Sequence, residues 1–131
     1  MTDHDHMTIR EMCDAFEVTP RTLRFYEAKE LLTPVRAGTR RLYTRRDRAR
    51  LKLILRGKRF GFSLEDIRQT LDLYDRSSGN ATQLLRTWQL AQDRLAAMEA
   101  QRAELDEAIA ELKTEIEASA PLIQGLRKAA E

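Results

Sequence analysis

The sequence predicts a mainly α-helical protein, built as a winged helix-turn-helix unit followed by one long helix that forms a coiled coil. Two short helical patterns joined by a tight turn come first, and a β-type segment centred on Gly38 follows them. Further along, apolar residues recur at alternating spacings of four and three over nearly five heptads. Only five glycines and three prolines interrupt the 131 residues, so we expect long regular helices.

The composition favours exposed helices over a compact enzyme core. Charged residues make up 34% of the chain, against roughly 25% in an ordinary globular domain. No apolar run reaches the roughly 18 residues of a membrane span, and no apolar signal segment follows the polar N-terminus. We therefore expect a soluble, cytoplasmic protein with no membrane partner. The single cysteine, Cys13, rules out an internal disulfide and a thiolate zinc site within one chain.

Charge is distributed unevenly along the chain. Residues 1–76 hold 17 Lys or Arg and 12 Asp or Glu, a net charge of +5, whereas residues 77–131 have a net charge of −3. Between Arg36 and Arg59 there are eleven basic residues and a single acidic one, Asp47. Such a stretch repels itself unless a polyanion lies nearby or the charges spread over a solvated face.

The first helix is predicted from its N-terminal signal. Residues 1–7 are expected to be a disordered tail, and the winged unit is placed at residues 8–76. Thr8 and Glu11 have the spacing of a capping box, in which each side chain bonds to the other residue's backbone N–H. The apolar residues that follow share one helical face, namely Ile9, Met12, Cys13 and Phe16.

The second helix is predicted over Pro20–Ala28. Thr19 is a good N-cap, and Pro20 suits the first helical position, where its missing N–H has no intrahelical partner to lose. We expect Leu23 and Phe25 to face inward. Four side chains are expected to face outward: Arg21, Thr22, Arg24 and Tyr26.

The residues on either side of Gly38 predict a small hairpin, or wing, from Val35 to Tyr43, with its tip near the glycine. Thr44 can cap a third helix over residues 45–59, and Gly61 is expected to end it.

Ser63 can cap a fourth helix, with Asp66 at the third position after it. Its inner face is expected to hold Leu64, Ile67, Leu71 and Tyr74. Residues 77–80 are read as a polar linker.

The last element is a heptad seam. At ~1.5 Å per residue a helix over residues 81–119 spans on the order of 58 Å, and one helix that long cannot bury its seam on a core made from about 70 residues. Its partner is most simply a second copy of the chain. Pro121 is expected to end the helix, leaving residues 120–131 as an apolar tail that can fold back. The predicted dimerisation residues are Leu84, Trp88, Ala91, Leu95, Met98, Arg102, Leu105, Ile109, Leu112 and Ile116.

Two seam residues have alternative interpretations. Arg102 is the only polar residue among these positions. It either fixes the register of the coil or extends to solvent from a wide antiparallel seam. Trp88, near the start of the seam, either packs under the winged unit or anchors the dimer interface.

Catalytic and metal-binding patterns are missing from the sequence. There is no Gly-rich phosphate loop, no Cys/His pairing for a nucleophile and no paired carboxylates in a predicted pocket. His4 and His6 could hold a metal, but two histidines in a disordered tail more often bind nothing. We therefore expect no enzyme activity, no catalytic residue, no metal site and no cofactor.

DNA binding is the function that the basic residues favour. Recognition in the major groove requires a helix whose N-terminal side chains reach base edges. Arg21 and Arg24 share a helical face, arginine can make two hydrogen bonds to guanine, and Thr22 can contact a thymine methyl. Tyr26 and Tyr43 add phenol donors for phosphates. Packing within the wing is an equal alternative for Tyr43, and a solvated face is the alternative for the arginines.

Three segments together resemble the MerR family of bacterial transcription regulators. They are Val-Thr-Pro-Arg-Thr-Leu-Arg-Phe-Tyr-Glu at residues 18–27 with Leu31, Leu32 and Pro34 after it, Gly-Thr-Arg-Arg-Leu-Tyr at 38–43, and Lys-Arg-Phe-Gly-Phe-Ser-Leu-Glu-Asp-Ile at 58–67. The resemblance covers residues 8 to about 75 by motif and the long helix by position.

The resemblance implies a winged helix-turn-helix homodimer joined by an antiparallel coiled coil. Such dimers bind a dyad in promoter DNA whose elements are too far apart, and bend and untwist it so that RNA polymerase engages both, often in response to a small-molecule effector. DNA deformation of this kind costs several kcal/mol. The implied DNA-binding residues are Thr19, Arg21, Thr22, Arg24, Tyr26, Arg36, Arg40, Arg41, Tyr43, Lys58 and Arg59.

The chain departs from the metal- and redox-sensing members of the family. Those members carry cysteines at the start of the dimer helix and in a loop after it, where this chain has Ser-Ser-Gly-Asn at residues 77–80 and Ala-Ser-Ala-Pro at 118–121. It is more similar to the short, Liu-type regulators of branched-chain amino-acid and acyl-CoA breakdown genes. The alternatives are an architectural or excisionase-type DNA-bending protein, or a protein-interaction module whose basic face is incidental.

Overall fold

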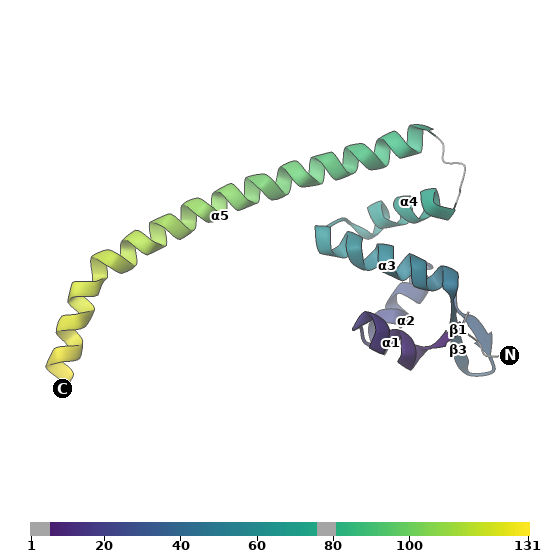
Figure 1. Ribbon diagram of the computed structural model, residues 1–131, viewed down its shortest axis with the longest axis horizontal. Helices are drawn as coiled ribbons and strands as arrows, with labels where there is room; N and C mark the ends of the chain where they lie inside the picture. The colour runs from purple at the N-terminus through teal and green to yellow at the C-terminus, as the bar shows by residue number, and fades with distance from the viewer. Residues whose placement is uncertain (1–5, 76–80) are drawn as a thin grey trace. The chain divides into compact units, whose positions relative to one another are not determined.

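The computed structural model describes residues 6–75 and 81–131, and it confirms a mainly helical chain with a small sheet and a long C-terminal helix (Figure 1). The chain divides into two compact units, residues 1–90 and 91–131. The elements in chain order are β1 (His6–Thr8), α1 (Ile9–Phe16), α2 (Pro20–Ala28), β2 (Val35–Ala37), β3 (Arg40–Thr44), α3 (Arg45–Phe60), α4 (Leu64–Asp75) and α5 (Ala81–Ala130).

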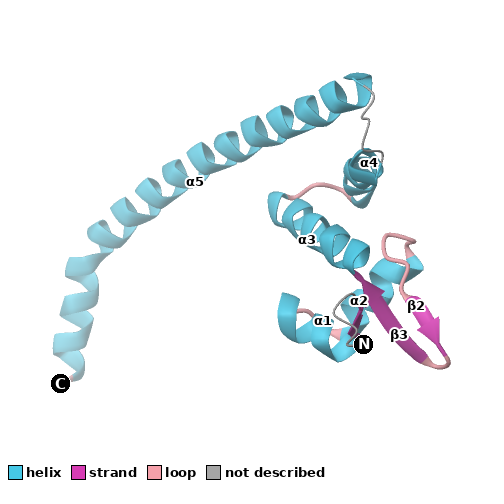
Figure 2. Ribbon diagram, turned by 45° about the vertical axis from the view of Figure 1, so that its right-hand side comes forward, coloured by secondary structure: helices cyan, strands magenta, loops and turns pink. Residues whose placement is uncertain are grey.

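The sheet has three antiparallel strands in the order β1-β3-β2, shown in magenta in Figure 2. The hairpin of β2 and β3 confirms the predicted wing, and Gly38 at its tip has φ of 66°, a left-handed value that glycine adopts without strain. Strand β1 is a correction, because His6 and Met7 were expected in a disordered tail. A strand of three residues has no readable alternation, and it exists here because His6 pairs with Thr44 across the sheet.

The helices begin where the capping signals predicted. In α1 the Thr8 hydroxyl accepts the Glu11 N–H at 3.2 Å, and the Glu11 carboxylate accepts the Thr8 N–H at 2.9 Å. In α2 the hydroxyl of Thr19 accepts the N–H of Thr22 at 3.2 Å, with Pro20 in the first turn. Each cap satisfies a backbone donor that has no partner within the helix.

Caps also define α3 and α4. The Thr44 hydroxyl accepts the Asp47 N–H at 3.1 Å, and Gly61 ends α3 with φ of 86°. The Ser63 hydroxyl accepts the Asp66 N–H at 3.1 Å at the start of α4. The predicted boundaries of both helices are confirmed to within a residue or two, because cap residues are local signals.

The core of the first unit lies where α1, α2 and α3 meet β3 and α4. Its buried apolar residues are Met12, Leu23, Tyr26, Leu31, Leu32, Tyr43, Leu51, Ile54, Ile67 and Leu71. Helices α3 and α4 approach closely at Gly57, where an added Cβ would lie 2.8 Å from Cγ1 of Ile67. This contact makes Gly57 part of the packing between the two helices.

Three aromatic side chains point differently from the prediction. Phe25 was expected inside and is 46% exposed, while Tyr26 was expected outside and is 5% exposed. The helical period explains both, since Tyr26 is three residues after the buried Leu23 and shares its face, whereas Phe25 is two residues after it. Tyr74, expected on the inner face of α4, is 55% exposed at the end of that helix.

Helix α5 runs for 50 residues and contains Pro121, so the prediction that the proline ends the helix is wrong. An interior proline removes one backbone hydrogen bond and usually kinks a helix instead of ending it when helix-forming residues follow. In Figure 1 the helix bends in its last, yellow part. The predicted linker at 77–80 lies outside the described residues.

Candidate nucleic-acid interface

The N-terminal half of α2 presents two exposed guanidinium groups. Arg21 and Arg24 are exposed, and within residues 6–75 and 81–131 neither forms an ion pair with a carboxylate. Thr22 lies between them, half-buried, with its hydroxyl 3.0 Å from the hydroxyl of Thr19. The two threonine hydroxyls thus serve the start of the helix, and the two arginines are the side chains that can extend to base edges.

Glu27 connects α2 to both strands of the wing. Its Oε1 accepts from Nη2 of Arg36 at 2.7 Å, and its Oε2 accepts from Nε of Arg41 at 2.7 Å. Arg36 is on β2 and Arg41 is on β3, so one carboxylate fixes the hairpin against α2. Two of the arginines predicted to bind DNA are therefore also structural. Arg40, at the start of β3, is also a predicted DNA-binding residue of the wing. It is exposed and is not one of the two arginines bonded to Glu27.

The two predicted tyrosines lie in the core. Tyr43 is fully buried, which supports the packing alternative and excludes a direct phosphate contact in this conformation. Its hydroxyl has no hydrogen-bond partner among the described residues, and burial raises the pKa of the phenol. Burial likewise raises the pKa of Tyr26, and its place in the core corrects its predicted outward position.

A second basic surface lies on α3. Lys58 and Arg59 are exposed in the last turn of the helix, beside the exposed Phe60, whose ring meets that of Phe62 edge to face at 6.4 Å between centroids. Both residues are among those that the family resemblance implies to bind DNA, and that interpretation stays a prediction.

Two carboxylates within or beside the basic part of the chain have structural roles that the charge count did not reveal. Asp47 is 1% exposed. Its Oδ1 accepts the Thr33 N–H at 3.0 Å and its Oδ2 accepts from the N–H and hydroxyl of Thr44, so it caps α3 and holds the segment before the wing. The spacing of Thr44 and Asp47, which is that of a capping box, is the signal that could have found it.

Asp75 ends α4 within a cluster of arginines. It accepts hydrogen bonds from Arg46 at 2.7 Å and from Arg50, and the Arg46 bond lowers the pKa of the Asp75 carboxyl. Arg50 is buried and also donates from Nε to the carbonyl of Leu31 at 2.8 Å. No local spacing links residues this far apart in the sequence, so this cluster could not be predicted.

The described part of the chain holds no group of three or more His, Cys, Asp or Glu side chains placed to bind a metal ion. Among the helices given above, none is both long and apolar enough to cross a bilayer. The exposed basic residues of α2, the wing and α3 remain the candidate site.

Comparisons with known proteins agree with this geometry. A family model described as "MerR HTH family regulatory protein" matches residues 7–73, and one described as "MerR, DNA binding" matches residues 48–114. The HTH-type transcriptional regulator ZntR of Escherichia coli (strain K12) is 39% identical over 99 residues, 74% of this chain and 69% of ZntR. The regulator HmrR of Rhizobium leguminosarum bv. viciae is 34% identical over 85 residues, 62% of this chain and 66% of HmrR.

Solved structures show the same fold. A MerR family transcriptional regulator from Bacillus cereus matches with a TM-score of 0.67 and 26% identity, covering 86% of this chain and 83% of that one. HiNmlR, a MerR family regulator lacking the sensor domain and bound to promoter DNA, matches with a TM-score of 0.61 and 25% identity, covering 79% and 78%. The homologues are regulators and not enzymes. The chain therefore belongs to the MerR family of helix-turn-helix, DNA-binding transcription regulators.

Proposed function

We propose that this regulator acts as a homodimer that binds a dyad in promoter DNA and bends and untwists the duplex between the promoter elements, so that RNA polymerase engages both. The observation that carries the proposal is the pair of exposed arginines on α2 together with the wing that Glu27 ties to the same helix. The proposal is supported by the exposed or half-buried positions of the other residues that the sequence predicts to bind DNA, on α2, the wing and the end of α3.

The dimer is supported by α5. Its predicted seam residues are exposed in the single chain, including Leu95 at 52%, Leu105 at 60% and Ile116 at 60%. An apolar stripe of this length on a soluble chain requires a partner surface. A second copy supplies one with the same heptad spacing.

Charge along α5 favours the antiparallel arrangement. Residues 81–98 have a net charge of +1 and residues 99–117 have a net charge of −5. A parallel pair would place the two acidic segments side by side along their whole length, whereas an antiparallel pair places part of each beside the more basic segment of the other chain. Opposite charges along a coiled coil set partner orientation in this way.

An effector is part of the proposal, and its chemistry is constrained by the sequence. The lead-bound regulator PbrR691 from Ralstonia metallidurans CH34 matches with a TM-score of 0.61 and 25% identity, covering 82% of this chain and 85% of PbrR691. Soft metals prefer thiolate ligands, and this chain has one cysteine, Cys13, which is half-buried in α1. We therefore propose a small-molecule effector that is not a thiolate-bound metal.

Footprinting on the promoter upstream of the protein's own gene cluster tests the proposal. A protected dyad between promoter elements that are set too far apart is the expected result. Arg24→Ala should weaken specific binding by roughly 1–3 kcal/mol if Arg24 contacts a base. Diffuse coating without a dyad would instead favour the architectural alternative, and an unchanged affinity would remove Arg24 from the site.

A further inference from the structure

The heptad pattern of α5 extends beyond the segment in which the sequence analysis placed it. After Ile116 the same alternating spacing continues through Ser119, Ile123, Leu126 and Ala130, across Pro121 and within one continuous helix. Ile123 is 43% exposed and Leu126 is 62% exposed. The last turns of α5 therefore present the same apolar stripe as the rest of the helix and are not a separate tail.

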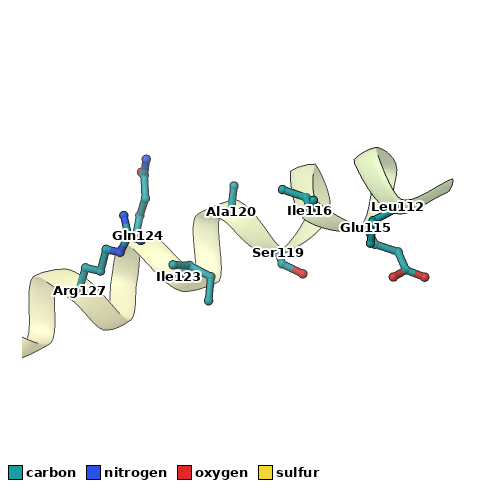
Figure 3. Close-up of a pocket in the computed structure, with 8 residues that line it drawn as sticks. All are labelled: Leu112, Glu115, Ile116, Ser119, Ala120, Ile123, Gln124 and Arg127. Carbon is teal, nitrogen blue, oxygen red and sulfur yellow. The ribbon is translucent and has the colours of Figure 1, made fainter. Parts of the chain in front are cut away.

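This part of α5 forms a shallow groove of about 450 Å³. Small residues, Ser119 and Ala120, form its middle, with Leu112 and Ile116 on one side and Ile123 on the other (Figure 3). Glu115 lies at its edge. The groove has large side chains at both ends and small side chains at its centre. This shape fits a large flat side chain from a facing helix.

We propose that this groove receives Trp88 of a second copy of the chain and thereby fixes the register of the dimer. The proposal rests on the homodimer proposed above. Trp88 is the only tryptophan in the chain, lies on the same seam and is 59% exposed. In an antiparallel pair each seam residue of one helix faces one of the other, and only a few registers, separated by whole heptads, keep both seams aligned.

Side-chain size selects one of these registers. If Trp88 faces Ser119 of the second copy, then Ala91 faces Ile116, and the largest side chain of the seam meets one of its smallest. A shift by one heptad in one direction brings Trp88 against Leu112, and a shift in the other direction brings it against Leu126. An indole opposite a leucine overfills its layer, whereas Ser119 leaves room for the indole.

Charges beside the seam agree with the same register. In an antiparallel pair, residues that flank the seam on one side lie beside residues that flank it on the same side in the second copy. With Trp88 facing Ser119, Arg94 lies beside Glu115 of the second copy. On the other side Glu99 lies beside Asp106 of the second copy, two exposed carboxylates whose repulsion water and salt screen. The attractive pair of Arg94 and Glu115 therefore lies next to the groove, and the repulsive pair of Glu99 and Asp106 lies near the middle of the coil.

Disulfide trapping tests the register directly. In a Cys13→Ser background, the pair Leu95→Cys and Leu112→Cys should form a covalent dimer under mild oxidation, because the proposed register places these positions opposite each other. The pair Leu95→Cys and Leu105→Cys would crosslink instead if Trp88 faced Leu112. The pair Leu95→Cys and Ser119→Cys would crosslink if Trp88 faced Leu126. An intramolecular bond is impossible between residues 95 and 112, since 17 residues of helix span about 25 Å and a disulfide joins Cα atoms within about 7 Å.

Tryptophan fluorescence tests the groove without cysteines. Emission should shift to shorter wavelength when the full-length protein passes from monomer to dimer with rising concentration, because the indole leaves water. Ser119→Glu should reverse the shift and raise the dimer dissociation constant at least tenfold. Thr114→Glu, which introduces the same charge on the outer face of the helix, is the matched control and should leave both unchanged.

The outcomes separate this inference from the proposed function. A dimer that crosslinks only through one of the two shifted pairs, or whose tryptophan emission does not move, overturns the register and leaves the homodimeric regulator standing. A full-length protein that stays monomeric at micromolar concentration, by light scattering, overturns the inference and the proposed dimer together. Crosslinking of the 95 and 112 pair together with the fluorescence shift supports the inference.

Discussion

Glu27→Gln should loosen the wing from the recognition helix. The substitution keeps the size of the side chain and removes the charge that holds Arg36 on β2 and Arg41 on β3. Both contacts are 2.7 Å long. Gln can accept a hydrogen bond from one arginine through its amide oxygen, but it cannot attract both. The change therefore tests one carboxylate that spans two elements of the candidate interface.

The magnitude follows from the exposure of each partner. The side chains of Glu27 and Arg41 are 19% and 24% exposed, and a charge-assisted hydrogen bond in such surroundings contributes roughly 1.5–3 kcal/mol. The Arg36 side chain is 51% exposed, so its ion pair is screened and adds about 0.2–1 kcal/mol. Allowing for the bond that Gln retains, Glu27→Gln should lower the free energy of unfolding by about 1–3 kcal/mol.

The same substitution should change DNA binding in two opposite ways. It removes one negative charge beside the arginines of the interface, which strengthens non-specific binding and steepens its dependence on salt by up to about one unit of slope. It also frees the wing, which weakens the specific complex because the wing is no longer positioned in advance. The ratio of specific to non-specific affinity should therefore fall, even where the total affinity changes little.

Urea denaturation and salt-titrated binding measure these effects, with protein concentration held fixed because a dimer's stability depends on it. Glu30→Gln is the matched control, since Glu30 carries the same charge, lies just after α2 and forms no ion pair among the described residues. The reasoning is refuted if Glu27→Gln and Glu30→Gln unfold at the same urea concentration and discriminate equally between operator and random DNA.

Further outcomes are expected elsewhere in the chain. Gly125→Ala should stabilise the dimer by about 0.5–1 kcal/mol, because the added Cβ meets open space on an exposed helix. Gly57→Ala should gain less or lose stability, because its Cβ would crowd Ile67 on α4. Chemical denaturation of the two variants compares these effects. The pKa of Asp75 is lowered in the folded state, so its contribution to stability is present above the unfolded pKa of ~3.9 and is lost as pH falls through the lower folded value; Asp75→Asn should flatten the acid limb of a stability-versus-pH curve. Replacing Leu95 and Leu105 by Asp should give monomers that bind a palindromic operator poorly, and a dimer in light scattering would show that the seam is assigned wrongly.

Much of the fold could be predicted because its signals are local. Cap residues such as Thr8, Thr19 and Thr44 mark helix starts within three or four residues of chain, and Gly38 marks the turn of the wing. A heptad pattern likewise depends only on spacing along one helix. Strand β1 depends instead on its pairing with β3, which no short sequence window reveals. The inward position of Tyr26 follows from its spacing from Leu23, a local signal that the prediction did not apply.

The candidate site divides in the same way. Arg21 and Arg24 were predicted to be exposed on the second helix, and they are exposed on α2. The roles of Glu27, Asp47 and Asp75 were missed, because a count of charges treats an acid in a basic region as a mere reduction of net charge. Glu27 contacts arginines on β2 and β3, Asp47 accepts from Thr33 fourteen residues earlier, and Asp75 contacts two arginines of α3. Such pairings between residues distant in the sequence appear only once the chain is folded.

From Leu95 to Glu131 every side chain of α5 is exposed in the single chain. A helix without tertiary contacts is held by intrinsic propensity alone, which is marginal in water, so in a dilute monomer this segment should fray and be open to proteases. Folding of the segment then depends on how many copies are present. A cell would clear newly made or scarce monomers faster than assembled dimers, so that the lifetime of this regulator rises with its own abundance.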